Sequence, residues 1–453
     1  MLQELSCFKA YDIRGKVPSE INEELFYKIG RVFPSIDRAD KIIVGYDVRP
    51  ESIDLARAVI KGLKDSGAVV VNIGLCGTEE VYFHCFNDEE IGGGMMITAS
   101  HNPKGYNGIK LVGKGARPMS LDGDLKKIRD LIINFKPNVL GRKGEELILE
   151  DKSQYIEHLL GYIDIDKLKP LRIVVNPGNG PAGIIVKLLS EFLPFEFIYI
   201  NEEPDGNFPN GVPNPMIVEN RIVTSQAVIK HKADLGIAWD GDFDRCFLFD
   251  EQGNYIEGYY IVGLLTESFL KKNSGGKIIY DPRLIWNTID IANENGGTAI
   301  QCKSGHSFIK EKMRLENAIY GGEMSAHHYF KQFGYCDSGM VPWLLITELI
   351  SISNKNLSEK VKYRINKFPC SGEINYRVTD AEKTIQAVLE RFKSHNPKID
   401  YTDGISLEFS NWRLNLRKSN TEALIRLNIE VKSREKPLKE LTAEVEAVIN
   451  LSK

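Results

Sequence analysis

The chain has 453 residues, of which 42% are hydrophobic and 26% are charged. One hydrophobic core rarely supports so long a chain, so about three domains are expected, at roughly 100–200 residues each. The composition excludes collagen-like, coiled-coil and largely disordered proteins. The net charge of −4 provides no overall attraction to nucleic acid or to an anionic membrane, and neither is expected as a partner.

The seven cysteines are odd in number and scattered, and no two of them form a Cys-x-x-Cys pair. This pattern is typical of reduced thiols rather than of a disulfide framework or a zinc site. Glu4 and Lys9 interrupt the N-terminal residues before an apolar signal segment can form, and no apolar run approaches the roughly 18 residues of a membrane span. We therefore expect a cytoplasmic protein.

Strand and helix patterns alternate through most of the chain. Lys41–Gly45 predicts a buried strand, Glu51–Lys64 a helix and Ala68–Ile73 a second strand. The same pattern recurs within Leu171–Ile200 and within Lys277–Cys302. Because each crossover helix must cover a face of the sheet that it connects, the three repeats predict α/β domains built on parallel strands.

The C-terminal part has a different pattern. Four short strand-like segments follow one another with close connections, and a helix begins near Pro437. The segments are Ile374–Val378, Ile405–Phe409, Trp412–Leu416 and Ala423–Val431. This arrangement predicts an α+β domain with an antiparallel sheet. Polar stretches near residues 143–146, 251–253 and 366–372 mark the candidate domain boundaries.

The first motif that could carry chemistry follows the apolar run Met95–Thr98. Ser100 and His101 lie there in a loop rich in Asn, Pro and Gly, residues that do not suit a helix interior, and Lys110 comes shortly after. The loop therefore presents a hydroxyl on a turn. A surface turn that satisfies its own backbone groups competes with a nucleophilic serine, and the loop alone does not decide between them.

Asp240, Asp242 and Asp244 alternate with other residues between two strand-like runs. Carboxylates at this spacing suit a hard divalent cation such as Mg²⁺ or Ca²⁺, and Gly241 is expected to let the backbone turn so that the three converge. An EF-hand is excluded because Arg245 occupies the position that requires glycine and because strands flank the loop. A solvated acidic turn is disfavoured because ligands collect at strand ends in α/β sheets.

Two later loops offer groups that suit a sugar phosphate. Glu323, Ser325 and His327 follow two glycines at the end of a strand-like run, and they mix donors with acceptors as sugar hydroxyls require. Arg417 opens a polar turn, Arg417-Lys-Ser-Asn-Thr421, whose guanidinium, hydroxyls and amide suit phosphate oxygens. A packing role for the histidine and a polar hairpin at the second loop remain alternatives for either motif taken alone.

Taken together, these motifs resemble the α-D-phosphohexomutase superfamily, and within it most closely the bacterial phosphomannomutases. The matching segments follow the family's order and cover essentially the whole chain. They are Phe8-Lys-Ala-Tyr-Asp-Ile-Arg-Gly15, Thr98-Ala-Ser-His-Asn-Pro103 with Tyr106-Asn-Gly-Ile-Lys110, Asp240-Gly-Asp-Phe-Asp-Arg245, Gly322-Glu-Met-Ser-Ala-His-His-Tyr-Phe330 and Arg417-Lys-Ser-Asn-Thr421. Agreement at five ordered places is not expected by chance.

The resemblance implies four domains rather than about three, arranged as a heart around a central cleft. Three are expected to be related α/β domains with mixed sheets, at residues 1–145, 146–252 and 253–366. They would carry the phosphoserine loop, the metal loop and the sugar-binding loop, in that order. The fourth, at residues 367–453, is expected to be an α+β phosphate-binding domain.

The resemblance also implies a role for each group in the motifs. Ser100 is expected as a phosphoserine that binds Mg²⁺ together with Asp240, Asp242 and Asp244. The residues expected to take part in phosphoryl or proton transfer are Ser100, His101, Lys110, Arg14, Arg245 and His327. Those expected to hold the substrate are Tyr11, Arg283, His306, Glu323, Ser325, His327, Arg417, Ser419, Asn420, Thr421 and Arg426.

The implied activity is the interconversion of mannose 6-phosphate and mannose 1-phosphate, supplying GDP-mannose synthesis, through a hexose 1,6-bisphosphate that also serves as activator. A phosphoglucomutase, or an enzyme that accepts both sugars, is the alternative because glucose and mannose differ only at C2. Arg283 stands where some dual-specificity relatives carry lysine. Lys110, His306 and His327 all remain candidates for moving the proton, because burial lowers the pKa of a lysine whereas phosphates raise it.

Two other classes of function remain open on these motifs. A phosphatase would form the same phosphoserine and pass the phosphoryl group to water, and it would release inorganic phosphate without forming an isomer. A protein that binds calcium or a sugar phosphate would bind its ligand without turnover. Hexose phosphates are the expected small-molecule partners, and the expected assembly is a monomer or a weak dimer.

Overall fold

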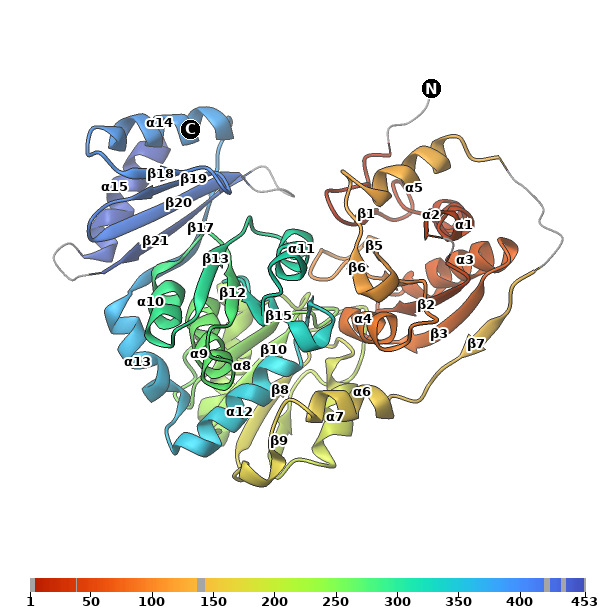
Figure 1. The fold of residues 1–453 in the computed structure, drawn as a ribbon, viewed down its shortest axis with the longest axis horizontal. Coiled ribbons are helices and arrows are strands. Elements are labelled where there is room, and N and C mark those ends of the chain that lie inside the picture. Colours follow the sequence, from red (N-terminus) through yellow and green to blue (C-terminus); the bar gives the residue numbers. More distant parts are fainter. Residues whose placement is uncertain (1–4, 38, 137–142, 419–423, 433–436, 452–453) are drawn as a thin grey trace. The chain divides into compact units, whose positions relative to one another are not determined.

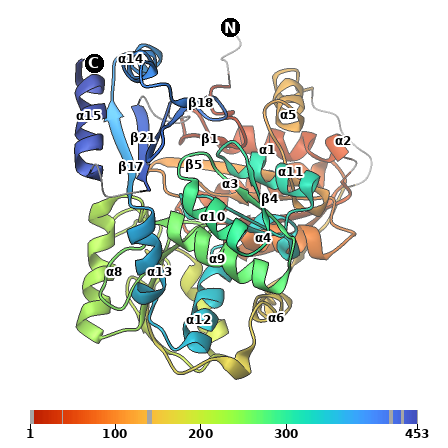
Figure 2. The same cartoon turned by 60° about the vertical axis from the view of Figure 1, so that its left-hand side comes forward.

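The computed structural model describes residues 5–37, 39–136, 143–418, 424–432 and 437–451. Within these ranges the chain forms two compact units, whose elements are labelled in Figures 1 and 2. The first unit comprises the residues up to Tyr255 together with His327–Asn354. The second comprises Ile256–Ala326 and the residues from Lys355 onward.

The N-terminal sheet of the first unit is mixed. Its strand order is β1-β5-β4-β2-β3-β7, with β6 paired to β5. Its strands are β1 (Ile13–Lys16), β2 (Lys41–Tyr46), β3 (Val69–Leu75), β4 (Gly93–Ile97), β5 (Tyr106–Gly113), β6 (Arg117–Pro118) and β7 (Glu146–Ile148). The accompanying helices are α1 (Glu23–Val32), α2 (Pro34–Asp37), α3 (Ser52–Asp65), α4 (Thr78–Asn87), η1 (Lys114–Ala116) and α5 (Asp124–Ile133). β2, β3, β4 and β7 are parallel, whereas β5 pairs antiparallel with β4 and with β1.

Apolar residues on both faces of the central strands explain why helices cover this sheet on two sides. Ile42 and Val44 of β2 lie in a buried cluster with side chains of α1, α3 and α5, while α4 packs on the other face. α1 and α3 touch backbone to backbone at Gly30 and Gly62. A Cβ atom on either glycine would lie 2.2 Å from a carbonyl oxygen of the other helix, so these positions accept no side chain.

The second sheet of the first unit has the order β11-β10-β8-β9. β8, β9 and β10 are parallel, and β11 returns antiparallel beside β10. Its elements are α6 (Ser153–Leu160), η2 (Ile165–Lys167), β8 (Arg172–Asn176), α7 (Ala182–Ser190), β9 (Glu196–Tyr199), α8 (Val218–His231), β10 (Leu235–Trp239) and β11 (Cys246–Phe249). The turn from β10 to β11 therefore carries the three aspartates at the end of a buried strand.

Residues 327–354 complete the first unit. They form the antiparallel pair β15 (His328–Phe330) and β16 (Cys336–Asp337), the short η3 (Lys331–Phe333) and α12 (Val341–Ser353). The Trp239 indole donates to the Gly339 carbonyl at 2.8 Å, and the buried Glu79 carboxylate accepts from the Ser338 hydroxyl at 2.9 Å. These buried hydrogen bonds join the segment to both sheets of its own unit.

The second unit begins with parallel strands and continues into an antiparallel sheet. β12 (Lys277–Tyr280) pairs parallel with β13 (Thr298–Gln301) and with β14 (Tyr320–Gly322). The helices of this part are α9 (Gly258–Lys272), α10 (Trp286–Glu294), α11 (His306–Glu316) and α13 (Leu357–Lys367). The antiparallel sheet has the order β17-β21-β20-β19-β18.

The strands of that C-terminal sheet are β17 (Cys370–Arg377), β18 (Lys398–Asp400), β19 (Ile405–Glu408), β20 (Trp412–Lys418) and β21 (Leu424–Val431). Two helices, α14 (Ala381–Lys393) and α15 (Leu438–Leu451), cover one face of it (Figure 1). Val388 of α14 and Val445 of α15 are fully buried against the sheet residues Leu407, Leu414 and Leu427. Among the helices in the described ranges, none is long and apolar enough to cross a membrane.

The elements expected from the sequence are largely confirmed. The three strand–helix–strand repeats are β2-α3-β3, β8-α7-β9 and β12-α10-β13, each with parallel strands, and the C-terminal sheet is antiparallel. The α/β sheets are mixed, as the resemblance implies: β5 and β11 run antiparallel because each returns from a short loop at the end of its neighbour. Periodicity also missed α14 and β18.

The expected domain bounds can be compared with the sheets and the compact units of the structure. The first domain was expected to end at residue 145, yet β7 begins at Glu146 and pairs with β3, so the first sheet continues past that point. The expected third domain, residues 253–366, contains residues of both compact units, and its bounds stay a prediction.

Within the second unit, the buried Glu430 of β21 ties the C-terminal sheet to the start of α10. Its carboxylate accepts the backbone N–H groups of Ile285 at 2.8 Å and Trp286 at 3.2 Å, and the Tyr259 hydroxyl at 2.5 Å. Arg413 lies 3.3 Å away as its ion-pair partner, and both side chains are almost completely buried. One carboxylate therefore caps a helix and neutralises a buried cation.

Replacing Glu430 by Gln is expected to lower the free energy of unfolding by about 3 kcal/mol, because Arg413 then remains buried without its countercharge. Chemical denaturation measures this loss. Glu440→Gln, on the exposed surface of α15, is the matched control and should change the free energy by less than about 0.5 kcal/mol. A Glu430→Gln loss as small as the control's would contradict this role.

Candidate active site

Ser100 lies in the loop between β4 and β5, and its backbone has a left-handed conformation with φ of 48°. This conformation costs a non-glycine residue about 1–3 kcal/mol, so surrounding contacts must hold it. The Ser100 N–H donates to the Thr98 hydroxyl at 2.8 Å, and the Ser100 Oγ donates to Asp240 Oδ2 at 2.8 Å. The strained turn thus directs a buried hydroxyl at the aspartate loop.

The three aspartates converge as the sequence spacing predicts. Carboxylate oxygens of Asp240, Asp242 and Asp244 lie within 4.8 Å of one another, and all three residues are buried. The Oδ1 atom of each has no hydrogen-bond partner in the described structure. Three buried oxygens without donors are the ligand set that a hard divalent cation requires, so these residues fit such an ion.

Gly241 has a different role from the expected one. Its φ is not in the left-handed region, which Phe243 occupies instead with φ of 44°. A Cβ atom on Gly241 would lie 2.6 Å from the carbonyl oxygen of Ser100. The glycine is therefore required by the close approach of the two loops rather than by the turn itself.

Cations surround the carboxylates. Lys110, on β5, places its Nζ 2.6 Å from Asp242 and 2.5 Å from Asp244. Arg245 donates to Asp240 Oδ2 from Nε at 2.8 Å and from Nη2 at 2.7 Å. Arg14 lies close by, where its guanidinium donates to the Asn102 side chain of the Ser100 loop at 2.9 Å.

These neighbours decide the charge of the titratable groups. Burial opposes a charged Lys110, but the carboxylates of Asp242 and Asp244 outweigh it and raise the lysine pKa, so the ammonium form persists. Burial, together with the charge of Asp242, raises the pKa of Asp244. Burial and the nearby guanidinium of Arg245 hold the pKa of His101 well below its usual value, so this imidazole is neutral.

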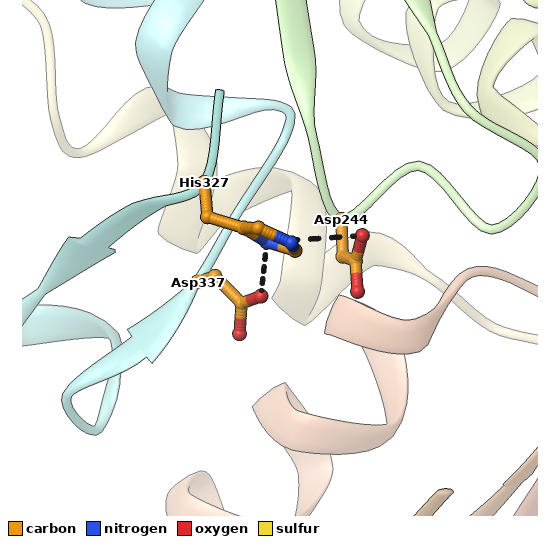
Figure 3. Close-up of side chains that lie close together, drawn as sticks. All are labelled: Asp244, His327 and Asp337. Carbon is orange, nitrogen blue, oxygen red and sulfur yellow. Dashed lines mark hydrogen bonds and ion pairs between the residues drawn. The ribbon is translucent and has the colours of Figure 1, made fainter. Parts of the chain in front are cut away.

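The two histidines have distinct partners. His101 Nδ1 lies 2.6 Å from Arg245 Nη2, and since an arginine only donates, this nitrogen accepts. His327 precedes β15, with its Nδ1 at 2.9 Å from Asp337 Oδ2 and at 3.9 Å from Asp244 Oδ1 (Figure 3). An imidazole between two carboxylates is placed to hold a proton beside the aspartate loop.

In the second unit, Arg283 follows β12 and organises another polar cluster. Its guanidinium pairs with Asp281 at 2.8 Å and donates to Glu323 Oε1 at 3.2 Å and to Ser325 Oγ at 3.1 Å. The N–H of Gly305 also donates to Glu323 Oε1 at 3.0 Å, which brings the start of α11 to this cluster. One buried arginine therefore fixes both Glu323 and Ser325, the acceptor and the hydroxyl group that are expected to bind a sugar.

Glu373, on β17, joins this cluster to the C-terminal sheet. Its carboxylate lies 3.0 Å from Arg417 Nη2, 3.1 Å from Arg426 Nη1 and 3.6 Å from Arg283 Nη1. Burial opposes its ionisation, but the positive charge of Arg417, followed by those of Arg426 and Arg283, lowers the pKa of Glu373. Three guanidinium groups converge on this carboxylate, although Arg283 also pairs with Asp281 and Glu323. Arg417 and Arg426 thus present guanidinium donors of the kind that bind anionic groups.

Four domain families match consecutive stretches of the chain. The phosphoglucomutase/phosphomannomutase alpha/beta/alpha domains I, II and III match residues 6–136, 153–253 and 257–368, and the C-terminal domain matches residues 373–448. The chain belongs to the phosphoglucomutase/phosphomannomutase family. The resemblance and the four-domain fold inferred from the sequence are thereby confirmed.

Relatives in this family are similar over their whole length. A Xanthomonas campestris protein named phosphohexose mutases is 54% identical over 441 residues, which cover 97% of this chain and 98% of the relative. A phosphomannomutase of Escherichia coli K12 is 51% identical over 436 residues, 95% of each chain. The crystal structure of a Burkholderia thailandensis phosphoglucomutase/phosphomannomutase family protein has a TM-score of 0.88 at 28% identity, covering 99% of this chain and 98% of its own.

The structure brings most of the expected family residues into two clusters, one in each unit. The cluster of the first unit contains Ser100, His101, Lys110, Arg14, Arg245, His327 and the three aspartates. The cluster of the second unit contains Arg283, Glu323, Ser325, Arg417 and Arg426. Tyr11 is half-buried just before β1, and His306 opens α11 next to Gly305. Ser419, Asn420 and Thr421 lie outside the described residues.

Sequence reasoning missed several residues of these clusters. Thr78, at the start of α4, donates to Asp242 at 2.6 Å, and Glu373 holds the arginines of the second unit. Asp337 holds His327, and Arg49 contacts the Ser100 loop. A threonine or a glutamate at a strand or helix end gives no signal by itself. The one available signal was that Asp337 follows His327 after a short hairpin.

A divalent cation is expected to raise the melting temperature, because the converging carboxylates exist only in the folded chain. At a free Mg²⁺ concentration 100-fold above its dissociation constant, the gain in free energy of unfolding is about 2.7 kcal/mol. Thermal melts in EDTA and with added Mg²⁺ measure it. Asp242→Asn should remove most of the response, whereas Asp54→Asn, exposed on α3, should keep it. An unchanged melting temperature for the unmutated chain would exclude a cation site.

Proposed function

We propose that the chain interconverts mannose 6-phosphate and mannose 1-phosphate through a phosphoserine at Ser100. The observation that carries this proposal is the approach of the Ser100 hydroxyl to Asp240, at 2.8 Å, beside three buried carboxylates and the buried cations Lys110 and Arg245. The same reaction is supported by membership of the family and by two relatives. One, named phosphohexose mutases, is 54% identical, and the other, named phosphomannomutase, is 51% identical.

Each half of the proposed cycle transfers one phosphoryl group. In the first half, the bond from phosphorus to Ser100 Oγ breaks, a bond to O1 of mannose 6-phosphate forms, and the O1 proton ends on Ser100 Oγ. The product is mannose 1,6-bisphosphate. In the second half, the phosphoryl group at O6 returns to Ser100 Oγ, whose proton ends on O6. Mannose 1-phosphate leaves and the phosphoserine is restored, so an added hexose 1,6-bisphosphate can load or reload the enzyme.

Proton transfer is best assigned to His327. Lys110 is a poor base, because two carboxylates hold it as an ammonium ion. His101 accepts an N–H from Arg245 at Nδ1, and its pKa is low because of burial and that neighbouring charge. His327 instead has the carboxylate of Asp337 at 2.9 Å, which stabilises the imidazolium that forms when the ring takes a proton.

The remaining groups of the first unit hold charge. A Mg²⁺ ion would be held by Asp240, Asp242, Asp244 and Ser100. When bound, it would neutralise charge on the phosphoryl oxygens. Lys110, Arg14 and Arg245 keep fixed positive charge around the same oxygens. Because hydrogen bonds and ion pairs already orient these donors, they need not reorganise when charge develops in the transition state.

The second unit supplies the groups that we assign to the substrate. Glu323 would accept hydrogen bonds from sugar hydroxyls, and Ser325 would donate hydrogen bonds to them. Arg283 donates to both side chains and thereby fixes their positions. Arg417 and Arg426 would bind the phosphate that does not react, together with Ser419, Asn420 and Thr421, which follow Arg417 closely in the sequence. A clamp of this kind would accept either end of the sugar phosphate, as the cycle requires.

All seven cysteines are free thiols, which supports a cytoplasmic location.

Ser100→Ala should abolish mutase activity while leaving the fold intact, because the substitution removes the only group proposed to carry the phosphoryl group. Initial rates with mannose 1-phosphate and a trace of hexose 1,6-bisphosphate measure the loss, expected at more than about 1,000-fold. Ser190→Ala on α7 is the matched control. Full activity of the Ser100→Ala protein would disprove the phosphoserine mechanism.

Sugar preference is tested by comparing kcat/KM for mannose 1-phosphate with kcat/KM for glucose 1-phosphate. The proposal predicts a higher value for the mannose compound. The ratio should be modest, because the two sugars differ only in the orientation of one hydroxyl. A value about 10-fold higher for glucose 1-phosphate would make the chain a phosphoglucomutase instead.

A further inference from the structure

Arg49 lies in the short segment between β2 and α3, outside every motif that pointed to function. Its side chain is almost fully buried beneath the loop that carries Ser100. The guanidinium donates to four carbonyl oxygens of that loop and its continuation into β5. They are those of Ser100 at 2.8 Å, Asn102 at 2.6 Å, Pro103 at 3.1 Å and Tyr106 at 3.0 Å.

The geometry uses both terminal nitrogens of the guanidinium group. Nη1 and Nη2 each donate to two carbonyls, and Nε lies 3.4 Å from Asp47 Oδ2. An arginine has five N–H donors in a planar fork, and the four on Nη1 and Nη2 each meet a carbonyl oxygen here, whereas Nε–H forms no hydrogen bond with the described residues. A lysine carries three donors on a single nitrogen and would leave at least one of these carbonyls without a donor.

Arg49 is itself fixed by neighbouring groups. The Asp47 Oδ1 atom accepts the backbone N–H of Arg49 at 3.0 Å and the Ser52 hydroxyl at 2.6 Å. Asn107, which begins the return of the loop into β5, donates to the same hydroxyl at 2.9 Å. The ring of Phe208 lies 5.3 Å from the guanidinium carbon. The fork is therefore held in place before it meets the loop.

The loop needs such a support at one point above all. The backbone of Ser100 has a left-handed conformation. Its carbonyl oxygen accepts from Arg49, and the same oxygen lies so close to Gly241 that a Cβ atom on that glycine would be 2.6 Å away. If this carbonyl turned away from Arg49, the peptide group between Ser100 and His101 would rotate. The Ser100 Oγ atom would then no longer point at Asp240. The contact thus acts on the direction of the nucleophile rather than on the charge of the site.

We propose that Arg49 is a positioning residue, which locks the Ser100 loop in the one backbone conformation that aims Oγ at the aspartate loop. The role in catalysis rests on the proposed function, whereas the control of loop geometry does not. A buried ion pair with Asp47 that merely stabilises the fold is the competing explanation. The two explanations predict different effects of Arg49→Lys, which conserves the charge. Only the positioning role predicts a change that is confined to the Ser100 loop.

The test compares Arg49→Lys with Arg57→Lys, an exposed arginine of α3. Arg49→Lys should lower kcat with mannose 1-phosphate by about 10- to 100-fold, because a small misplacement of a reacting group costs that much. KM should change less than about threefold, since the substrate-holding residues are untouched. Phosphorylation of Ser100 by hexose 1,6-bisphosphate, followed by intact mass, should slow by a similar factor. Arg57→Lys should match the unmutated chain.

Amide hydrogen exchange separates loop geometry from overall stability. In Arg49→Lys, exchange should accelerate in residues 99–107 and stay unchanged in the strands of both units. Should this variant fail to fold, Ser52→Ala, which removes a hydrogen bond to Asp47 and one from Asn107 without touching the guanidinium, should show a smaller change that extends beyond Asn107 to residues 99–106.

Three results would overturn the proposal: an unchanged kcat, an unchanged loop, or a loss of protection spread evenly through the chain. Failure of the proposed function is recognised separately. In that case the unmutated chain converts no hexose phosphate, and faster exchange confined to residues 99–107 of Arg49→Lys would still support the positioning of the loop by Arg49.

Discussion

Three carboxylates buried within one short loop are the constraint on which the first unit depends. Asp240, Asp242 and Asp244 would repel one another, and their desolvation would cost several kcal/mol each, unless donors and cations were brought to them. Lys110 comes from the first sheet, and Arg245 is the last residue of the loop before β11. The two sheets of the unit are therefore joined through the charges of the site itself.

The same charges suit the chemistry that we propose. A phosphoryl group on Ser100 would add negative charge beside Asp240, where Arg245 already donates from two nitrogens. The ammonium of Lys110 stays charged because Asp242 and Asp244 raise its pKa above the ordinary value. A site with fixed cations and room for one divalent ion can carry a highly charged intermediate without large rearrangement of its side chains.

Much of this arrangement was predictable from the sequence, and the reasons differ from residue to residue. Alternating aspartates between two strands specify a cation loop because spacing and strand ends are local properties, and β10 and β11 flank that loop as expected. The pairing of Lys110 with Asp242 was not predictable, because 132 positions separate the two residues. The role of Gly241 was misread because a close approach to Ser100 leaves no local signal. Arg49 was missed for the same reason, since an arginine before a helix looks like any surface cation until its four carbonyl partners are known.

The central claim is that phosphate travels from Ser100 to a sugar and not to water. The most direct measurement loads the enzyme with radiolabelled phosphate at Ser100 and follows the label in a single turnover after addition of mannose 6-phosphate. The account predicts that the label passes to hexose 1,6-bisphosphate and then to mannose 1-phosphate. Appearance of the label as inorganic phosphate, at the rate at which the phosphoserine disappears, would contradict it and indicate a phosphatase.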